Sequence, residues 1–451
     1  MKALLIGETK RSEDIENTLK KNSIETTLVC GIEEICKKLG EDVYSCVIVD
    51  NDVVSKNGPA VKNDIIEAIK RSGREYMVVS SDCGFDFIDE ARAMGARDII
   101  LRPYNDREFH LRFEACCAGK LKISCIGGGT GLYNVLSGLK KIPNSLLTSI
   151  VSMTDDGGST GRLRESFGTL PPGDLRMSLV ALSRASILMN KVLQYRFQSG
   201  GECFTGHNIG NLVLVALSEI FGSMKQGIKN LGEILNIQGI VIPVTMTNAR
   251  LNAQFEDGTV IKGETRIDLG EGRNPELRIK KIWHEPPTEC DHDAYISILC
   301  ADAVVIGPGD LYTSVITNLE VGRLKDAVVK TSAKKIYICN LMTKPGETND
   351  YSACDHVRDI ISYLGCDCLD YVIISDTRFS SETLDSYTGE GQFQVMVDHG
   401  EKFSDITKAR IIIADVAHGD GLIRHDGSKI RNVIEKVLRG PKEVKSLRQN
   451  N

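Results

Sequence analysis

The feature that most constrains the fold is a regular alternation of short apolar runs with helical patterns along almost the whole chain. In the first 118 residues, β-rich runs lie at 3–6, 25–29, 45–50, 76–81 and 98–101. Helical patterns separate these runs near 12–21, 31–39, 60–72, 84–93 and 105–117. Strands that alternate with helices are joined by crossovers, which gives a parallel sheet covered on both faces. The sequence therefore predicts an α/β fold.

A second series of the same kind begins at 122–128 and continues to about residue 440. Further strands are expected at 147–152, 239–245, 302–307, 334–340, 370–375 and 409–415, with helices that include 174–184 and 208–222. Two alternating runs within 253–267 flank Asp257-Gly258, which predicts a β-hairpin decorating the main sheet. We expect a flavodoxin-like domain at 1–118, a Rossmann-like doubly wound domain at 121–440 and a polar tail at 441–451.

Composition excludes several classes of protein. The 451 residues carry a net charge of −6, so the broad basic face of a nucleic-acid-binding protein is not expected. No stretch approaches the roughly 18 apolar residues of a membrane span, and the start does not resemble a signal peptide. The 14 cysteines are scattered without paired CxxC spacing, which favours free thiols over zinc ligands. A cytoplasmic protein is the expectation.

The stretch SCIGGGTGLYNVLSGLK at 124–140 predicts a strand, a glycine turn and a helix. It matches neither the GxGxxG dinucleotide pattern nor the P-loop. Glycines nevertheless let backbone amides approach an anion, and the following helix points its positive end at the same place. The candidate phosphate-binding residues are Gly127, Gly128, Gly129, Thr130 and Gly131; a merely tight turn is the alternative.

The next strand ends in TDDGGSTGRLR at 154–164. Adjacent carboxylates at the carboxyl end of a parallel strand lie where such folds bind ligands. Together with hydroxyls and guanidiniums they suit a diphosphate, with Mg²⁺ as a cofactor held by the two acids. The candidates are Asp155, Asp156, Ser159, Arg162 and Arg164, with a solvated acidic turn as the alternative.

Two further motifs open helices. In PPGDLR we expect Asp174 to cap the helix, and Arg176 then lies in the first turn, where a cation gains nothing from the helix dipole. Arg176 is therefore a candidate for a ligand contact rather than a plain surface arginine. GHNIGNL places His207, Asn208 and Asn211 at another helix start, as ligand-rim or structural residues.

The later strands repeat the theme. GPGDLYTSVITNL follows the strand at 302–307, and NLMTKPGET follows the next one. Polar, glycine-bearing loops after successive strands of one parallel sheet meet at one edge, which predicts a single phosphate-binding cleft. These loops add as candidates Gly307, Gly309, Thr313, Ser314, Asn318 and Asn340.

The first 118 residues resemble a response-regulator receiver domain. Such domains place an acidic pair after strand 1, a phosphorylated Asp after strand 3, a Ser/Thr after strand 4 and Lys-Pro after strand 5. Here those positions hold Gly7-Glu8, Asp50, Ser80 and Arg102-Pro103. One acid has become glycine and the lysine an arginine, which disfavours Mg²⁺ and phosphorylation chemistry. We interpret the segment as a degenerate receiver used for docking or homodimerisation, with phosphorylation of Asp50 as the alternative.

The six glycine-bearing motifs, with RHDGSKI at 424–430, resemble the YvcK group of gluconeogenesis factors, relatives of the transferase CofD. The resemblance covers about 122–440. It implies a regulator of cell shape and cell-wall precursor flux that binds a UDP-sugar such as UDP-N-acetylglucosamine and signals to an unidentified protein partner. Thr130 and Asn318 are then the expected polar contacts.

The CofD branch offers an alternative, a Mg²⁺-dependent 2-phospho-L-lactate transferase acting on a nucleoside-diphosphate ester. In that case Asp155 and Asp156 would serve the metal and the acceptor hydroxyl. The sequence leaves open whether the chain is catalytic. A receiver-controlled output protein is a third possibility.

Overall fold

A computed structural model describes residues 1–41, 43–270, 274, 276–397, 402–419 and 421–440. The chain divides into two compact units. The first comprises 1–122 together with 144–146 and 292–302, and the second comprises 123–143, 147–291 and the chain from 303 onward. No helix among the described residues is long and apolar enough to cross a membrane.

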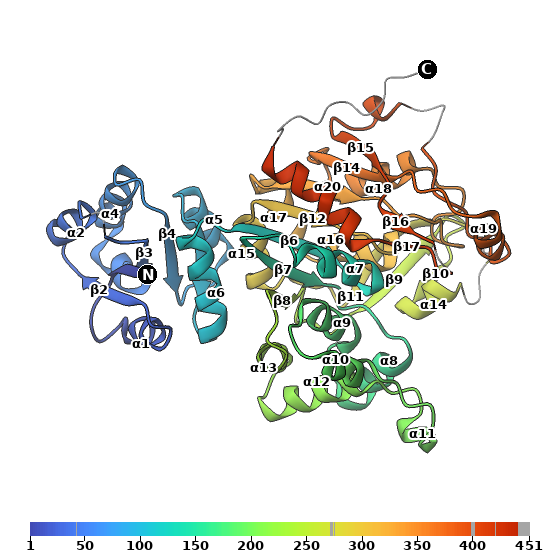
Figure 1. The fold of residues 1–451 in the computed structure, drawn as a ribbon, viewed down its shortest axis with the longest axis horizontal. Helices are drawn as coiled ribbons and strands as arrows, with labels where there is room; N and C mark the ends of the chain where they lie inside the picture. Colours follow the sequence, from blue (N-terminus) through green and yellow to red (C-terminus); the bar gives the residue numbers. More distant parts are fainter. Residues whose placement is uncertain (42, 271–273, 275, 398–401, 420, 441–451) are drawn as a thin grey trace. The chain divides into compact units, whose positions relative to one another are not determined.

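The first unit is built on a five-stranded parallel sheet, drawn in blue shades in Figure 1. Its strands are β1 (Lys2–Ile6), β2 (Glu25–Val29), β3 (Cys46–Asp50), β4 (Tyr76–Ser80) and β5 (Asp98–Leu101). The helices are α1 (Glu13–Lys21), α2 (Ile32–Leu39), α3 (Asn51–Val54), α4 (Pro59–Arg71), α5 (Phe85–Ala93) and α6 (Asp106–Cys117), with a 3₁₀ turn at Ser55–Asn57. The order β2-β1-β3-β4-β5 is flavodoxin-like and confirms the predicted fold.

Helix α15 (His292–Leu299), although distant in sequence, also belongs to the first unit. It packs on α5, where the Tyr295 hydroxyl donates to Asp89 at 2.8 Å and the Tyr295 ring meets Phe85 edge-on. The core of this unit lies between the sheet and its helices and includes Leu5, Ile48 and Phe109.

The second unit holds a seven-stranded sheet in the order β15-β14-β13-β12-β6-β7-β8. The strands are β6 (Leu121–Gly127), β7 (Ser145–Val151), β8 (Ile240–Pro243), β12 (Ala303–Ile306), β13 (Lys334–Ile338), β14 (Tyr371–Ser375) and β15 (Arg410–Ala414). β12 pairs in parallel with both β6 and β13. The chain runs outward from β6 in one direction and returns to build β12 on its other side, so β6 and β12 form the topological switch point of the sheet.

Helices cover this sheet and extend beyond it (Figure 1). They are α7 (Gly129–Leu139), α8 (Gly158–Phe167), α9 (Pro172–Leu182), α10 (Ile187–Gln194), α11 (Gly201–Phe204), α12 (Ile209–Ile220), α13 (Met224–Ile234), α14 (Glu264–Leu269), η2 (Leu311–Ile316), α16 (Thr317–Leu319), α17 (Leu324–Lys330), α18 (Ala353–Leu364), α19 (Ser381–Thr388), η3 (Phe403–Asp405) and α20 (Gly427–Arg439). A Cβ on Gly138 of α7 would lie 1.9 Å from the carbonyl oxygen of Gly427, so α7 and α20 are in backbone contact.

Two local predictions were wrong. The helix expected near 174–184 is present as α9, but Asp174 is not its N-cap: the helix begins at Pro172, because proline is suited to the first helical position, so Pro171 is the N-cap and Asp174 lies inside the first turn. The hairpin around Asp257-Gly258 is present as β9 (Arg250–Phe255) and β10 (Val260–Lys262), but it does not extend the main sheet. It forms a separate antiparallel sheet with β11 (Ile279–Glu285), a strand that was not predicted.

A two-stranded ribbon, β16 (Ala417–His418) and β17 (Arg424–His425), lies between β15 and α20 in the chain. The polar tail predicted for 441–451 lies outside the described residues.

Candidate ligand-binding site

Two glycine loops meet at the switch point of the seven-stranded sheet. The first follows β6: Gly128 is extended and Gly129, at φ +60°, begins α7. The second follows β12, where Gly307 has φ +72°. A Cβ on Gly131 would lie 2.4 Å from the carbonyl oxygen of Pro308, so only glycine permits this approach of the two loops. The predicted strand–turn–helix is confirmed, and its use as a phosphate site remains a prediction.

A cleft of about 250 Å³ opens over these loops. Both loops contribute to its wall, as do the residues that follow β13, helix α19 and strand β17. Its polar lining includes Thr130, Asn134, Asp310, Asn340, Tyr387 and Arg424. The side-chain oxygen of Asn340 is buried and accepts no hydrogen bond from the residues that the structure describes. The cleft is therefore lined by hydroxyl, amide, carboxylate and guanidinium side chains.

His425 also lines the cleft, but its imidazole ring is buried and contacts the protein backbone. It lies 3.2 Å from the carbonyl oxygen of Cys339, and burial lowers the pKa of His425 to about 4. The ring is therefore neutral at physiological pH and contributes no positive charge to the cleft.

Asp155, which follows β7, and Asp174, in the first turn of α9, form an acidic pair beside the first glycine loop. Asp155 accepts the backbone N–H of Gly157 at 3.0 Å, and burial raises the pKa of Asp155. Burial, together with the negative charge of Asp155, raises the pKa of Asp174 to about 7. A Cβ on Gly128 would lie 2.5 Å from a carboxylate oxygen of Asp174. Three motifs that are distant in sequence are thus brought together at one edge of the sheet.

Helix α14 adds acids to the same edge. Asp156 accepts the backbone N–H of Thr265 at 2.8 Å, which ties the loop after β7 to the start of this helix. Burial, helped by the charges of Asp155 and Asp268, raises the pKa of Glu264 to about 9. Glu264 was not predicted as a site residue, because 264–267 continue the alternation of the hairpin and were expected to be a strand.

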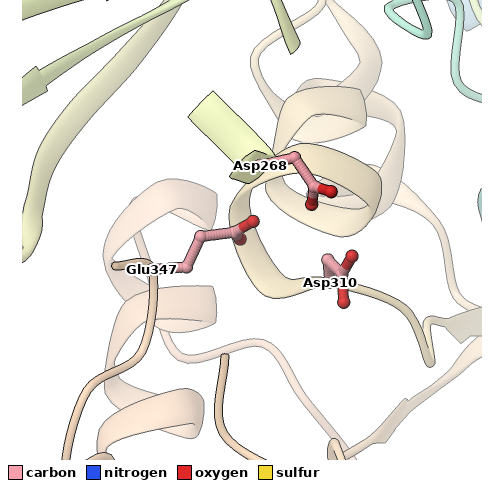
Figure 2. Close-up of side chains that lie close together, drawn as sticks. All are labelled: Asp268, Asp310 and Glu347. Atoms are coloured by element: carbon pink, nitrogen blue, oxygen red, sulfur yellow. The ribbon is translucent and has the colours of Figure 1, made fainter. Parts of the chain in front are cut away.

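A second acidic cluster, formed by Asp268, Asp310 and Glu347, was also missed. One carboxylate oxygen from each lies within 4.8 Å of the others, and Figure 2 shows the three side chains converging. Lys344 supplies the opposite charge: its Nζ donates to Asp268 and, at 2.6 Å, to Asp310. Burial and the charge of Asp310 raise the pKa of Glu347 to about 7. Carboxylates arranged in this way are suitable ligands for a divalent cation. In this structure the Lys344 ammonium group supplies the positive charge beside them.

The motif GHNIGNL packs on α8 and α9 rather than on the cleft. The Ser159 hydroxyl lies 3.1 Å from Nδ1 of His207 and accepts the side-chain amide of Asn211 at 3.4 Å. Arg176 donates to Asn211 at 2.9 Å, and Asn208 is the N-cap of α12. These predicted site residues therefore form a buried polar network that joins three helices.

The remaining candidates divide between the cleft and the protein interior. Arg162 donates to the Thr205 carbonyl at 2.8 Å, and Arg164 donates to Asn248 at 2.6 Å, so both guanidiniums bind other loops of the protein. Asn318 is fully buried, donates to the Ser314 carbonyl and does not line the cleft. The Thr313 hydroxyl bonds Glu347 at 3.2 Å.

Of the sequence candidates, the following line the cleft: Thr130, Gly131, Gly309 and Asn340. Asn134, Tyr387 and Arg424 line it too and were not proposed individually, although RHDGSKI had singled out the segment that contains Arg424.

In the first unit, Arg102 binds the receiver-like acids. Its guanidinium donates to both oxygens of Asp50 at 3.1 and 3.0 Å, to Asp52 at 2.9 Å and to Asp14 at 2.8 Å. The Ser80 hydroxyl donates to Asp52 at 3.2 Å. Asp50, Ser80 and Arg102 thus lie close together, through contacts that Asp52 shares.

The Glu8 carboxylate pairs with Arg11 at 3.2 Å, and the Glu8 backbone N–H donates to the Ser12 hydroxyl at 3.2 Å. The neighbouring acid position holds Gly7, where a Cβ would lie 2.2 Å from the Ser12 hydroxyl oxygen. The Ser12 hydroxyl in turn donates to Asp50 at 2.6 Å. A hydroxyl and a guanidinium therefore surround the carboxylate that receivers phosphorylate.

Comparisons with known proteins agree on the second unit. The family model "2-phospho-L-lactate transferase CofD" matches residues 123–417. A putative gluconeogenesis factor of Thermotoga maritima is 42% identical over 322 residues, which is 71% of this chain and 100% of that protein. The gluconeogenesis factor of Bacillus subtilis is 38% identical over 323 residues, covering 71% of this chain and 99% of that one.

A solved structure supports the same relationship. A crystal structure of a UPF0052 family protein from Bacillus halodurans superposes with a TM-score of 0.66 at 36% identity. It covers 70% of this chain and 99% of the other.

Proposed function

This chain belongs to the CofD family, and we propose that within it the protein is a UDP-sugar-binding regulatory factor of the gluconeogenesis-factor type. The proposed role is in cell shape and in cell-wall precursor and gluconeogenic metabolism, exerted through a protein partner. Relatives named gluconeogenesis factors match over nearly their whole length, which supports this branch of the family over the transferase branch.

The observation that carries the proposal is the cleft at the β6–β12 switch point. Doubly wound sheets bind nucleotides at this place, outside the carboxyl ends of the strands. The N-terminus of α7 offers backbone N–H groups and positive dipole to a diphosphate, with the Thr130 hydroxyl beside them. Arg424 lines the same cleft and supplies a fixed positive charge.

Calorimetric titration with UDP-N-acetylglucosamine, with and without Mg²⁺, tests this proposal. We expect saturable binding in the wild-type protein. Thr130→Ala should weaken it about 10- to 100-fold, the cost of losing one hydrogen bond to a charged group. Thr130→Ser keeps the hydroxyl and is the matched control. Absence of binding in the wild type, or equal affinities of the Ala and Ser variants, would contradict the proposed site.

A second candidate function is the Mg²⁺-dependent transfer of a phospholactyl group from a nucleoside-diphosphate ester. The raised pKa values of Asp155 and Asp174 favour it, because buried carboxylates that repel one another are groups that a divalent cation neutralises. Asp155 and Asp156 fit Mg²⁺ as oxygen donors, and the ion would supply charge neutralisation to a diphosphate.

Asp155→Asn separates the two functions. A regulator that binds a UDP-sugar without metal keeps its affinity in this variant, whereas a transferase loses turnover by orders of magnitude. No heat with UDP-N-acetylglucosamine, combined with Mg²⁺-dependent binding of a guanosine diphosphate ester, would assign the chain to the transferase branch.

A further inference from the structure

The turn between α18 and β14 carries two cysteines separated by one residue, Cys366-Asp367-Cys368. Helix α18 ends at Leu364, and Gly365, in the left-handed conformation at φ +80°, is its C-cap. The Cys368 backbone N–H then donates to the Cys366 carbonyl oxygen at 3.1 Å. A hydrogen bond from residue i+2 back to residue i closes a γ-turn, so the chain folds back on itself at Asp367. The turn precedes β14 and therefore lies at the amino-terminal edge of the sheet, opposite the cleft.

The γ-turn brings the two thiols into contact. Consecutive Cα atoms are about 3.8 Å apart, so residues i and i+2 of such a turn lie within the range of about 4.4–6.8 Å that a disulfide spans. The Cys366 and Cys368 side chains are also hydrogen bonded to each other. Both are free thiols in this structure, with Cys366 exposed and Cys368 partly exposed. The two sulfurs can therefore reach bonding distance without a change in the fold.

Asp367, the central residue of the γ-turn, fixes it to a neighbouring loop. Its carboxylate accepts the Thr407 hydroxyl at 2.9 Å and the Lys408 backbone N–H at 2.7 Å. These two residues come shortly before β15, which pairs with β14. The turn is therefore held by hydrogen bonds on both sides, and the thiols stay close together.

A second pair of close thiols shows why access to solvent matters. Cys46 and Cys116 lie 3.4 Å apart in the core of the first unit, but they are 0% and 2% exposed. A dissolved oxidant meets the exposed Cys366 directly and does not reach that buried pair. Burial and the charge of Cys366 raise the pKa of Cys368 to about 11, so Cys368 is protonated at neutral pH. Cys366 is therefore the thiol that reacts first.

Two thiols alone are too few for a structural zinc site, which takes four ligands. Among the residues that the structure describes, three or more convergent metal-ligating side chains are found only at Asp268, Asp310 and Glu347. Reversible oxidation is the chemistry that remains for the pair.

We propose that Cys366 and Cys368 form a redox-active dithiol that exchanges with low-molecular-weight disulfides. In the first step the Cys366 thiolate attacks one sulfur of such a disulfide, forms a mixed disulfide and releases one thiol. In the second step the Cys368 sulfur loses its proton and attacks the Cys366 sulfur, and the second thiol leaves. One disulfide is thus reduced to two thiols, which take up the two protons of the dithiol, and the Cys366–Cys368 bond forms.

Equilibrating the full-length protein with mixtures of reduced and oxidised glutathione tests the proposal. After an acid quench and alkylation with iodoacetamide, trypsin cleaves at Arg358 and Arg378 and releases peptide 359–378, which contains both cysteines and no other. We expect an unalkylated peptide about 2 Da lighter than the dithiol, the mass of two hydrogens, in a proportion that follows the oxidised fraction of the buffer. Excess reduced glutathione should return the peptide to its doubly alkylated form.

Three kinds of variant define the roles of the residues. Cys368→Ser should stop the reaction at a glutathione mixed disulfide on Cys366, because no second thiol remains. Asp367→Ala keeps both thiols but releases the turn, so the equilibrium constant for disulfide formation should fall about 10-fold; Asp367→Asn keeps an acceptor and should fall less. Cys203→Ser removes an exposed cysteine outside the turn and should change nothing.

The proposal fails if peptide 359–378 of the wild type stays doubly alkylated at every glutathione ratio. A wild type that accumulates the mixed disulfide would also overturn it, because Cys368 would then not complete the exchange. Equal equilibrium constants for the wild type and Asp367→Ala would show that the anchored turn does not position the thiols.

Discussion

Replacing Arg102 by methionine should destabilise the first unit by about 4 kcal/mol. The reason is that Asp50 is completely buried, with 0% side-chain exposure, and Arg102 is the cation bonded to both of its oxygens. Removing one partner of a buried ion pair costs about 3–5 kcal/mol. The pairs with Asp14 and Asp52, whose side chains are 43% and 30% exposed, add at most about 1 kcal/mol each.

The measurement must report on the first unit separately, because the chain has two. The single tryptophan, Trp283, lies in the second unit and is unsuitable as the probe. Hydrogen exchange of the amides in β3 (Cys46–Asp50) gives the opening free energy of the sheet directly. We expect that free energy to fall by about 4 kcal/mol in Arg102→Met and by less in Arg102→Lys, which keeps the charge without the planar fork.

The cause can be separated from simple loss of packing. Asp50→Asn removes the carboxylate that Arg102 neutralises, so Arg102→Met should cost only about 1–2 kcal/mol in that background. Mg²⁺ should partly restore Arg102→Met, whose three remaining carboxylates can bind it, and should leave the wild type unchanged. An Arg102→Met protein within 1 kcal/mol of wild type, or an equal cost in both backgrounds, would refute the view that Arg102 stabilises this unit by neutralising the buried Asp50 carboxylate.

Two more variants test the edge of the second sheet. Gly131→Ala places a Cβ 2.4 Å from the Pro308 carbonyl oxygen, so we expect a loss of about 1–3 kcal/mol in urea unfolding and weaker UDP-sugar binding, with unchanged affinity as the contrary result. Asp174→Asn addresses pH: because the pKa of Asp174 is raised from 3.8 to about 7, the carboxylate reduces stability increasingly as pH rises through that range. The variant should therefore be more stable than wild type by up to about 4 kcal/mol above pH 7 and equal to it at pH 4, and parallel pH profiles would contradict this.

The strands were predictable because strands buried on both faces of a parallel sheet are apolar runs. The runs at 122–128 and 302–307 correspond to β6 and β12, and every residue of β12 is buried. The order of the strands, which sets where the switch point lies, depends on the crossover connections. The sequence predicted the class of fold but not this order.

Which side chains lie close together at the edge of the sheet was harder to predict from the sequence. Helix α14 was expected to be part of a strand because its sequence continues the alternation of the hairpin. Gly263, at φ +99°, lies between β10 and this helix. The helix brings Glu264 toward Asp155, which is more than 100 residues earlier in the chain. It also brings Asp268 toward acids that are more than 40 residues further along. Contacts between such distant segments depend on the tertiary fold, and local pattern carries no signal for them.

The distribution of charge along this edge decides how a diphosphate would lie. Among the described residues, Asp155, Asp174, Glu264 and Glu347 all have raised pKa values, chiefly through burial and through the charge of neighbouring carboxylates. The arginines after β7 are bonded to other loops, and Lys344 is bonded to Asp268 and Asp310. A ligand with two or more negative charges would be attracted to the α7 N-terminus and Arg424, whereas beside the acids it would only favour their protonated forms further. We therefore expect Mg²⁺ to strengthen UDP-sugar binding only if the diphosphate extends toward Asp155. A titration in which Mg²⁺ changes nothing would place the phosphates wholly on the glycine-loop side of the cleft.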